Sequence, residues 1–530
     1  MWDSKPVAIA ASTAIPLVVW FLSKLYKQRQ LFKGLPGPPH HPILGHLIVM
    51  GEIARSLPPD ANPQMYANLI RERYNLGDMF YLDLWPLSWP QMIIIDPALA
   101  VEVTQVHNLP KGKFVRQFLG PLVGKHAMVA VNGAEHRLVR SFFSAGYSTS
   151  NILRHVPDMV DKTEIFVDIL NKHAAEKHIF PMEEATSRLI FDIMGAIIFD
   201  SDFNSQRTDY CLMVDFRDLA QLLPTFILER YLSDLNPFRQ YQRWKLAQSI
   251  NAEIERMLRD RFNSKSGRQR SLAKQSSHIV DVGYKTYFKG GFAEKGDDFT
   301  PELDKVFMDT FITQCKTFLF AGHDSSSSTI CYVYHLLSKH PEVLSKLRAE
   351  HDEVFGENVS DAPRLLREQP ALLQKLDYTM SVIKEVLRIY PPIGGSYRYG
   401  DPNISLTYNG TSYPTNPFAV YVVDHAMLRH PGLFKDPLRF YPERYTAAAS
   451  DPYFVPKDAW RAFEKGPRNC IGEAMAVVQI KVILALTVRS FDVQAAYEGV
   501  GPVVAGERMY QTLHVTAKPK DSMPARVVAR

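Results

Sequence analysis

The sequence predicts a mainly helical fold with a smaller β portion. From about Ala134 onward, apolar residues recur with a helical period. The longest such stretch runs from Pro301 to Lys339, and His340 and Pro341 end it. Short runs of β-branched and aromatic residues between turn residues predict strands near both ends of the chain. These runs are Met79–Leu84, Gln91–Ile95, Ile404–Tyr408 and Val420–Val423.

The composition indicates a folded protein with a large core. The chain has 530 residues, of which 46% are hydrophobic and 22% charged, so disorder is excluded. A net charge of +5 is too small for the dense basic patches of a nucleic-acid binder, so no nucleic-acid partner is expected. The cysteines are too widely spaced for a CxxC pair or a disulfide framework, which favours a reducing compartment. They are Cys211, Cys315, Cys331 and Cys470.

The N-terminus carries an apolar, uncharged stretch, Val7–Leu22. As a helix it falls slightly short of the ~30 Å hydrocarbon core, and Trp20 and Tyr26 could extend it at the interface. Residues 1–26 are therefore predicted to form a transmembrane anchor. Basic residues follow the stretch, which favours a cytosolic main domain over the alternative of a cleaved signal peptide. These are Lys24, Lys27, Arg29 and Lys33, whereas only Lys5 precedes it.

Residues 27–46 predict a basic, proline-rich linker, and residues 47–530 a single folded domain. Prolines between Gly34 and His46 exclude a helix there and favour a stiff extended spacer. Within the domain, Ser264–Ser277 predicts an exposed connection. Sequons at Asn358, Asn403 and Asn409 would be glycosylated only in a lumenal protein, so their occupancy tests the topology.

The stretch FEKGPRNCIGEA places Cys470 between a basic, glycine-containing run and an apolar segment. A lone cysteine is usually a small buried apolar residue. Here Gly466 permits a tight bend, and Gly472 allows a close approach of the backbone to a flat group. The apolar segment after Gly472 predicts a buried helix, so Cys470 precedes a helix N-terminus where N–H groups favour a thiolate. Arg468 adds positive charge, and such a sulfur suits an axial ligand of haem iron.

The pattern F-x-x-G-x-R-x-C-x-G resembles the haem-ligand loop of the cytochrome P-450 superfamily, the haem-thiolate monooxygenases. It is filled by Phe463, Gly466, Arg468, Cys470 and Gly472. The resemblance implies that Cys470 is the proximal ligand of haem b (iron protoporphyrin IX). It also implies that Arg468 meets a haem propionate and that Phe463 shields the sulfur.

KEVLRIYPP contains Glu385 and Arg388 on one helix face, which by itself is most often a surface ion pair. It resembles the family's E-x-x-R motif, and FYPERY supplies a third partner, Arg444. A buried Arg–Glu–Arg network needs full hydrogen bonding, so its expected role is structural. Arg398 is similar in position to a propionate-binding arginine of the family.

AGHDSSSS, within the long helix, resembles the family's A/G-G-x-D/E-T-T motif. By itself it could be a solvent-facing polar turn, but apolar flanks favour burial. The resemblance implies that Asp324 is the acid and Ser325 the alcohol of proton delivery, with Ala321 and Gly322 beside the haem. Ser325 stands where threonine is usual. Its hydroxyl is predicted to bond the carbonyl of Ala321 and to open the helix locally as an O₂ groove.

NGAEHRLVRSFF resembles the family's W-x-x-x-R helix that faces the propionates. Arg140 matches the arginine. His136 stands at the tryptophan position, where it could contact a propionate or equally be a surface residue.

The resemblance implies a monooxygenase that inserts oxygen from O₂ into a hydrophobic small molecule. Electrons would come from NADPH through a separate cytochrome P-450 reductase, and Lys465 and Lys481 could form part of its basic docking face. The general style resembles fungal microsomal members that modify polyketides or terpenoids, with the catalytic domain on the cytosolic side of the endoplasmic reticulum membrane. By family position, the pocket would be lined by Phe114–Lys125, the region Phe216–Phe226, Phe318 and Ile393–Gly395.

Two alternatives stay open. The same scaffold could catalyse desaturation, ring rearrangement or multi-step oxidation. Dependence on NADPH and O₂, together with the products formed, would distinguish these reactions. A membrane-anchored binding protein without activity is also conceivable, because a fold by itself does not imply activity.

Overall fold

The computed structural model describes residues 5–223, 233–263, 276–289 and 303–530, including the side chains from residue 16 onward. The helices are α1 (Lys5–Leu31), α2 (Leu47–Arg55), α3 (Tyr66–Arg73), α4 (Pro97–Val101), α5 (Lys113–Val123), α6 (Gly133–Phe143), α7 (Thr149–Leu153), α8 (Val156–Glu176), α9 (Met182–Phe199), α10 (Cys211–Gln221), α12 (Pro237–Asn263), α14 (Ile279–Tyr287), α16 (Lys305–Lys339), α17 (Pro341–Phe355), α18 (Ala362–Glu368), α19 (Asp377–Ile389), α20 (Asp424–Met427) and α21 (Glu473–Thr487). Short helical turns are η1 (Pro63–Met65), η2 (Glu102–Val106), η3 (Val359–Asp361), η4 (Pro370–Lys375), η5 (Pro442–Tyr445) and η6 (Lys520–Ser522).

The strands confirm a smaller β portion at the two ends of the chain. They are β1 (Met79–Leu82), β2 (Gln91–Ile94), β3 (Phe180–Pro181), β4 (Ser396–Tyr399), β5 (Ser405–Tyr408), β6 (Thr411–Pro414), β7 (Ala419–Val422), β8 (Phe491–Ala495), β9 (Gln511–Thr512), β10 (Lys518–Pro519) and β11 (Pro524–Ala529). Each of the four runs predicted as strands overlaps one of them, although β7 starts one residue before the run Val420–Val423.

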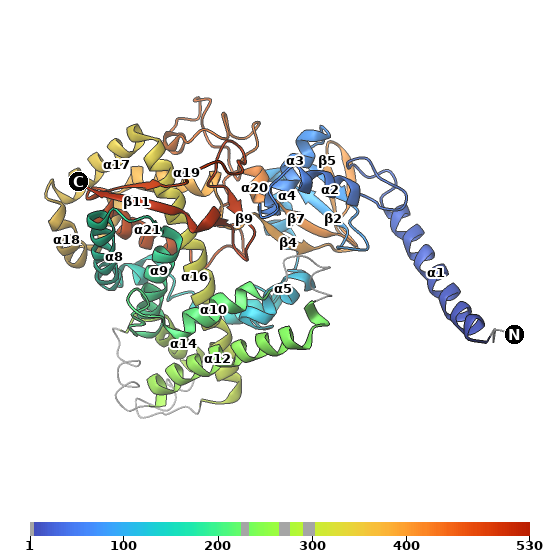
Figure 1. Ribbon diagram of the computed structural model, residues 1–530, viewed down its shortest axis with the longest axis horizontal. Helices are drawn as coiled ribbons and strands as arrows, with labels where there is room; N and C mark the ends of the chain where they lie inside the picture. Colours follow the sequence, from blue (N-terminus) through green and yellow to red (C-terminus); the bar gives the residue numbers. More distant parts are fainter. Residues whose placement is uncertain (1–4, 224–232, 264–275, 290–302) are drawn as a thin grey trace.

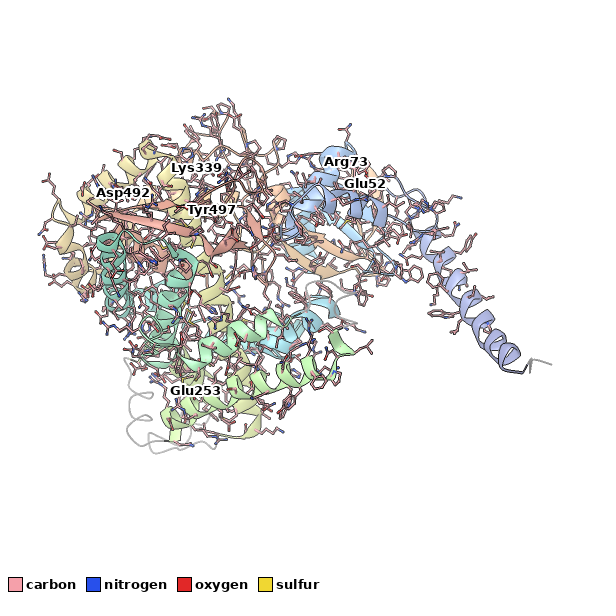
Figure 2. The ribbon with its side chains drawn as sticks, viewed as in Figure 1. Glu52, Arg73, Glu253, Lys339, Asp492 and Tyr497 are labelled. Carbon is pink, nitrogen blue, oxygen red and sulfur yellow. The ribbon has the colours of Figure 1, made fainter. Side chains whose placement is uncertain are left out.

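A four-stranded sheet in the order β1-β2-β7-β4 forms the smaller lobe (Figure 1). Strand β2 runs parallel to β7, with Ile93 opposite Tyr421, and the other pairs are antiparallel. Apolar residues of this sheet share a core with α2, α3 and α4, to which Ile53, Ile70 and Leu99 contribute. On the surface of this lobe, Arg73 of α3 pairs with Glu52 of α2 at 3.0 Å (Figure 2).

Helix α16 runs through the larger, helical lobe and contacts α5, α9, α12, α19 and α21 (Figure 1). It begins where the Asp304 carboxylate caps the N–H of Phe307, and it ends before Pro341 as predicted. Most of its residues are buried on all faces. Because α21 is also buried and apolar on most sides, these two helices form the interior scaffold of the site.

The C-terminal strands bring the end of the chain back to α16. Strand β11 pairs with β3 and β8, and β10 pairs with β9. The turn between β9 and β10, residues 513–517, lies against α16, because the Ser328 hydroxyl donates to the carbonyl of Ala517 at 2.7 Å. This hydrogen bond, between residues 189 positions apart in the sequence, holds the C-terminal segment against α16.

Helix α1 extends from the smaller lobe (Figure 1) and ends at Leu31, so the first residues of the predicted linker, 27–31, are helical. Its end is fixed by Arg29, which pairs with the fully buried Asp83. From Gly34 to His46 the chain is free of helix, as its prolines predict. Among the described residues, no helix combines the length and hydropathy needed to cross a bilayer.

The predicted connection Ser264–Ser277 lies almost wholly outside the described residues, which resume at Ser276. The helix α14 follows directly after it.

Candidate active site

Cys470 lies in a non-helical loop that ends where α21 begins. The loop is closed by a hydrogen bond from the Cys470 N–H to the carbonyl of Phe463 at 2.9 Å. Gly472 is the residue before the first turn of α21, and a Cβ on it would meet only the Cys470 sulfur, at 3.8 Å. Cys470 is exposed, although it directly precedes a buried helix. The loop therefore presents one sulfur to a space large enough for a ligand.

The groups around the sulfur act on its ionisation in opposite directions. Although the sulfur is accessible, the protein around it removes much of its contact with water and so raises the pKa of Cys470, and the N–H groups of Gly472 and Glu473 together with Arg140 oppose that rise. The predicted N–H donors are present, and Arg140 is the cation among the groups that act most strongly on the sulfur. On balance the pKa of Cys470 lies above its usual value, and a bound metal ion would supply further stabilisation of a thiolate.

Gly466 has φ +84°, a conformation that other residues adopt at a cost. A Cβ there would lie 2.6 Å from Cγ of Gln105 and 3.0 Å from the carbonyl of Thr104. The predicted tight bend is confirmed, and it holds the loop against η2.

Gly466→Ala is therefore expected to lower the free energy of unfolding by about 1–3 kcal/mol, measured by urea denaturation. Gly499 is the matched control, since it has φ +69° but nothing within 4 Å. Gly499→Ala incurs the backbone strain alone. Equal losses in the two variants would show that the contact with Gln105 is unimportant.

A group of basic side chains lies near the Cys470 loop with few partners. Arg398 is 1% exposed, and its Nε and Nη2 have no hydrogen-bond partner. Burial, with repulsion from Arg398 and Arg140, lowers the pKa of Arg468 to about 10. Burial, with Arg468, lowers the pKa of His136 to about 4. Burial, with Arg398, lowers the pKa of Lys111 to about 7.

This arrangement fits the carboxylates of a haem. Buried guanidinium N–H groups without acceptors are costly, and mutually repelling cations call for an anion. His136 is 5% exposed, so the alternative of a surface residue is excluded. Lys111 was not foreseen from the sequence, because it lies in a loop with no helical or strand pattern to place it. Arg398, Arg468, His136 and Lys111 would hold the propionates.

Arg140 and Arg468 already have protein partners. Arg140 donates to the backbone and side-chain oxygens of Asn469, both at 2.8 Å. Arg468 donates to Asn132 at 3.2 Å and to the carbonyl of Met128 at 3.1 Å. Arg140 therefore fixes the residue beside the ligand cysteine, and its predicted contact with a propionate stays a prediction.

On α16 the motif AGHDSSSS divides between two faces. Ala321 is exposed in an otherwise buried stretch, so it faces the same kind of open space as Cys470. Ser325 donates to the carbonyl of Ala321 at 2.8 Å, the predicted bond. The helix nevertheless stays continuous from Lys305 to Lys339, so the predicted local opening is wrong for this state.

Gly322 and Asp324 point away from the Ala321 face. A Cβ on Gly322 would lie 2.5 Å from Met194 of α9, so this glycine permits close packing of α9 and α16. Its predicted place beside the haem stays a prediction.

Asp324 is 4% exposed and lies 2.8 Å from Lys518 of β10, while Thr516 donates to its second oxygen. Burial raises the pKa of Asp324, but Lys518, together with His323 and Thr516, more than offsets burial and leaves the pKa below its usual value. These partners were not foreseen from the sequence.

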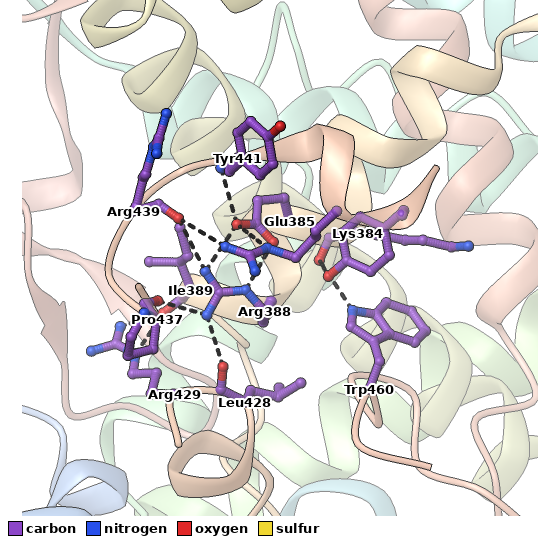
Figure 3. Close-up of polar contacts among 12 residues, drawn as sticks. Lys384, Glu385, Arg388, Ile389, Leu428, Arg429, Pro437, Arg439, Tyr441 and Trp460 are labelled. Carbon is purple, nitrogen blue, oxygen red and sulfur yellow. Dashed lines mark hydrogen bonds and ion pairs between the residues drawn. The ribbon is translucent and has the colours of Figure 1, made fainter. Parts of the chain in front are cut away.

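Glu385, Arg388 and Arg444 form the predicted network (Figure 3). Glu385 accepts from Arg388 Nε at 2.8 Å and from Arg444 Nε at 2.9 Å, and the Tyr441 N–H donates to it at 3.1 Å. Arg388 also donates to the carbonyls of Leu428 and Pro437. All three charged side chains are fully buried, so the network ties α19 to the chain leading into the Cys470 loop.

Some predicted pocket and docking residues lie elsewhere. Phe318 packs against Phe143 and Tyr147 at 5.0 and 5.1 Å and is 5% exposed, so it belongs to the core. Lys481 is buried and donates to the carbonyl of Leu373, and Lys465 pairs with Asp458. Neither lysine is a free surface cation, so the predicted basic docking face is wrong for these two.

Within the predicted pocket segment Phe114–Lys125, two aromatic side chains pack together, and one of them also contacts β4. Phe114 of α5 lies 5.3 Å from Tyr397 of β4 and 6.0 Å from Phe118, and Ile393 is half exposed. Residues 224–226 of the Phe216–Phe226 region lie outside the described residues. Beside Cys470, a cavity of about 480 Å³ is lined by Arg140 of α6, Tyr147 between α6 and α7, and Val478 of α21, among others.

Comparisons with known proteins agree with this site. The family model described as Cytochrome P450 matches residues 35–514. The cytochrome P450 monooxygenase polC of Polytolypa hystricis is 34% identical, over 98% of this chain and 95% of the relative. The cytochrome P450 monooxygenase acrF of Aspergillus aculeatus is 35% identical, over 89% of this chain and 98% of the relative. A crystal structure of a cytochrome P450 (CYP102L1) superposes with a TM-score of 0.73 at 20% identity, covering 94% of this chain and 99% of that chain.

The family model covers most of the chain, both relatives exceed 30% identity over nearly their whole length, and the fold agrees. Together with an accessible Cys470 and the unpartnered donors of the buried Arg398, these findings show that the chain belongs to the cytochrome P450 monooxygenase family.

Proposed function

We propose that this protein hydroxylates or epoxidises a hydrophobic small molecule, a polyketide or terpenoid intermediate of fungal secondary metabolism. The observation that carries the proposal is the accessible sulfur of Cys470 beside buried, unpartnered donors of Arg398. The apolar and aromatic side chains of α5 and β4 support a hydrophobic substrate. Two relatives named as monooxygenases come from fungi, which supports the assignment to fungal metabolism.

The chain's own residues would position the reaction. Haem, when bound, supplies the activation of O₂ and the oxidation of the substrate. Cys470 would hold the iron, and Arg398, Arg468, His136 and Lys111 would hold the propionates. Ser325 and Asp324 would pass protons from the protein interior to the side of α16 where Ala321 is exposed. Overall, substrate, O₂, NADPH and a proton become hydroxylated product, water and NADP⁺.

Incubation of the membrane fraction with NADPH, O₂ and a metabolite extract tests this function, with mass spectrometry as the readout. A product heavier by one oxygen, labelled from ¹⁸O₂, is expected. A product lighter by two hydrogens, or an isomer, would instead support desaturation or ring rearrangement on the same scaffold. Absence of any NADPH-dependent product would favour a binding protein.

Electrons are proposed to arrive from a separate NADPH–cytochrome P450 reductase. The cavity beside Cys470 lies between α6 and α21 and gives a partner access to the ligand loop. Because Lys465 and Lys481 are engaged by other groups, charge at this face must come from other residues. Reconstitution with purified reductase is expected to give turnover that NADPH alone does not.

We also propose that the protein sits on the cytosolic face of the endoplasmic reticulum membrane. Helix α1 exposes apolar side chains, among them Val19, Trp20 and Leu22. The start of α12 exposes Phe238 and Trp244. Burying such aromatic and aliphatic groups in lipid relieves their contact with water. Membrane pelleting, together with unoccupied sequons at Asn358, Asn403 and Asn409, is the expected result; glycosylation at any of them would contradict a cytosolic domain.

Ser325→Thr is expected to lower the ratio of peroxide to product. The β-branched residue restricts its hydroxyl to fewer rotamers, so the bond that Ser325 makes to Ala321 is held more firmly. Ser325→Ala, which lacks the hydroxyl, is expected to reduce product formation by roughly 10²-fold. Peroxide and product are measured together against NADPH consumed. An unchanged ratio in both variants would show that the hydroxyl has no part in proton delivery.

A further inference from the structure

Lys518 lies between two buried carboxylates that come from different helices. Its Nζ is 2.8 Å from Oδ1 of Asp324 on α16 and 2.8 Å from Oε1 of Glu183 at the start of α9. Asp324 and Glu183 are 4% and 6% exposed. Both carboxylates strongly raise the pKa of Lys518 against the effect of burial, so the ammonium stays charged.

The charges in this cluster do not balance one to one. Two carboxylates share a single ammonium, whereas a simple ion pair would need only one of them. If Asp324 leaves Lys518, the ammonium is still paired with Glu183, so no buried cation is left without a partner. Without Glu183, the same movement would leave Lys518 unpaired, which is costly in the interior. Glu183 therefore makes the release of Asp324 energetically accessible.

The same contacts connect the cluster to the turn 513–517. Thr516 donates to Asp324, Ser328 donates to the carbonyl of Ala517, and the Ala517 N–H donates to the carbonyl of Pro392. Pro392 leads into the segment Ile393–Gly395, which the resemblance to the family predicts at the substrate pocket. A displacement of this turn would thus pull on Lys518 and Asp324 directly.

We propose that Lys518 is a positioning residue. Its ion pair with Asp324 keeps this carboxylate from delivering protons, and Asp324 is released when that pair breaks while the ion pair between Lys518 and Glu183 remains. This proposal rests on the proposed monooxygenase function and deepens it. The titratable groups that face Asp324 are His323 on α16, Glu183 on α9, Lys518 on β10 and His514 on the turn. Burial lowers the pKa of His323 and of His514, and among the groups that lower the pKa of Asp324 Lys518 acts most strongly, ahead of His323 and Thr516.

The first test measures the ionisation of Asp324 by infrared spectroscopy of the haem-bound protein at neutral pH. In wild type the carboxyl of Asp324 is ionised and gives no protonated-carboxyl band. In Lys518→Met burial prevails, so Asp324 takes up a proton and a new band appears. The part of this band that Asp324 contributes is expected to vanish in Lys518→Met/Asp324→Asn, which leaves only the part from the equally buried Glu183, and no band is expected in Lys518→Arg. A Lys518→Met protein without the band would overturn the proposal.

The second test measures how NADPH consumption divides between product and peroxide. Glu183→Gln leaves Lys518 with Asp324 as its sole carboxylate, so the acid is held more tightly and the peroxide-to-product ratio is expected to rise several-fold. Lys518→Arg is expected to keep the wild-type ratio. A purely structural role would lower stability in both Lys518→Met and Glu183→Gln without moving the band or the ratio. A wild-type ratio of peroxide to product in Glu183→Gln would overturn the proposal that Glu183 makes the release of Asp324 possible.

The two tests separate this proposal from the proposed function. Wild-type protein without NADPH-dependent product would contradict the monooxygenase assignment, whatever the infrared result. Turnover in wild type with no infrared band in Lys518→Met would keep that assignment and overturn the role of Lys518.

Discussion

Glu385→Ala is expected to lower the free energy of unfolding by about 3–5 kcal/mol and to prevent stable haem uptake. Glu385 is the carboxylate shared by Arg388 and Arg444, and its oxygens are 2.8 and 2.9 Å from their Nε atoms. Without it, two fully buried guanidinium groups lose their counter-charge, and Tyr441 loses the acceptor of its N–H. Urea denaturation and the absorbance of bound haem measure the two effects.

Lys346→Ala is the matched control, because Lys346 pairs with Glu443 at the surface of the same region. Its side chain is 58% exposed, so water replaces the pair and a loss below about 1 kcal/mol is expected. If Glu385→Ala kept the stability and haem content of wild type, the network would not be the device that fixes the chain around the ligand loop.

Cys470→Ser is expected to abolish product formation while the protein stays folded. The hydroxyl is a far weaker ligand than a thiolate, and it does not donate the electron density that favours O–O cleavage. The rest of the loop, including the bond from the residue 470 N–H to the carbonyl of Phe463, does not depend on sulfur. Product formation and circular dichroism are measured on the same sample.

Cys211→Ser is the control for the loss of an accessible thiol elsewhere. Cys211 is exposed at the start of α10, and full activity is expected after its replacement. Full activity in Cys470→Ser as well would contradict the assignment of Cys470 as the ligand.

Features carried by local spacing were predictable from the sequence. The long helix, its end at Pro341 and the four strand positions follow from periodicity and turn residues. The bond from Ser325 to Ala321 follows from helical spacing, and Gly466 from the need for a tight bend. The Glu385 network was predictable because two of its members share a helix face and a family motif supplies the third.

Features that depend on distant parts of the chain were not predictable. Lys518 stands on a two-residue strand with no periodic signal, and only the folded β9–β10 pair brings it to Asp324. Lys111 is likewise placed by a loop. Phe318 was placed by family position and Lys481 by its closeness to the ligand loop in the sequence. Both were assigned to the wrong environment, because neither kind of evidence tells which neighbours cover a side chain.

The most direct test of the account is the absorption spectrum of the dithionite-reduced, carbon monoxide-treated protein, since its central claim is a bond between Cys470 and haem iron. The red-shifted Soret band of thiolate-ligated haem is expected in wild type and in Cys211→Ser, and it should be missing in Cys470→Ser. A folded, haem-containing wild-type protein without that band, or a Cys470→Ser protein that keeps it, would contradict the account.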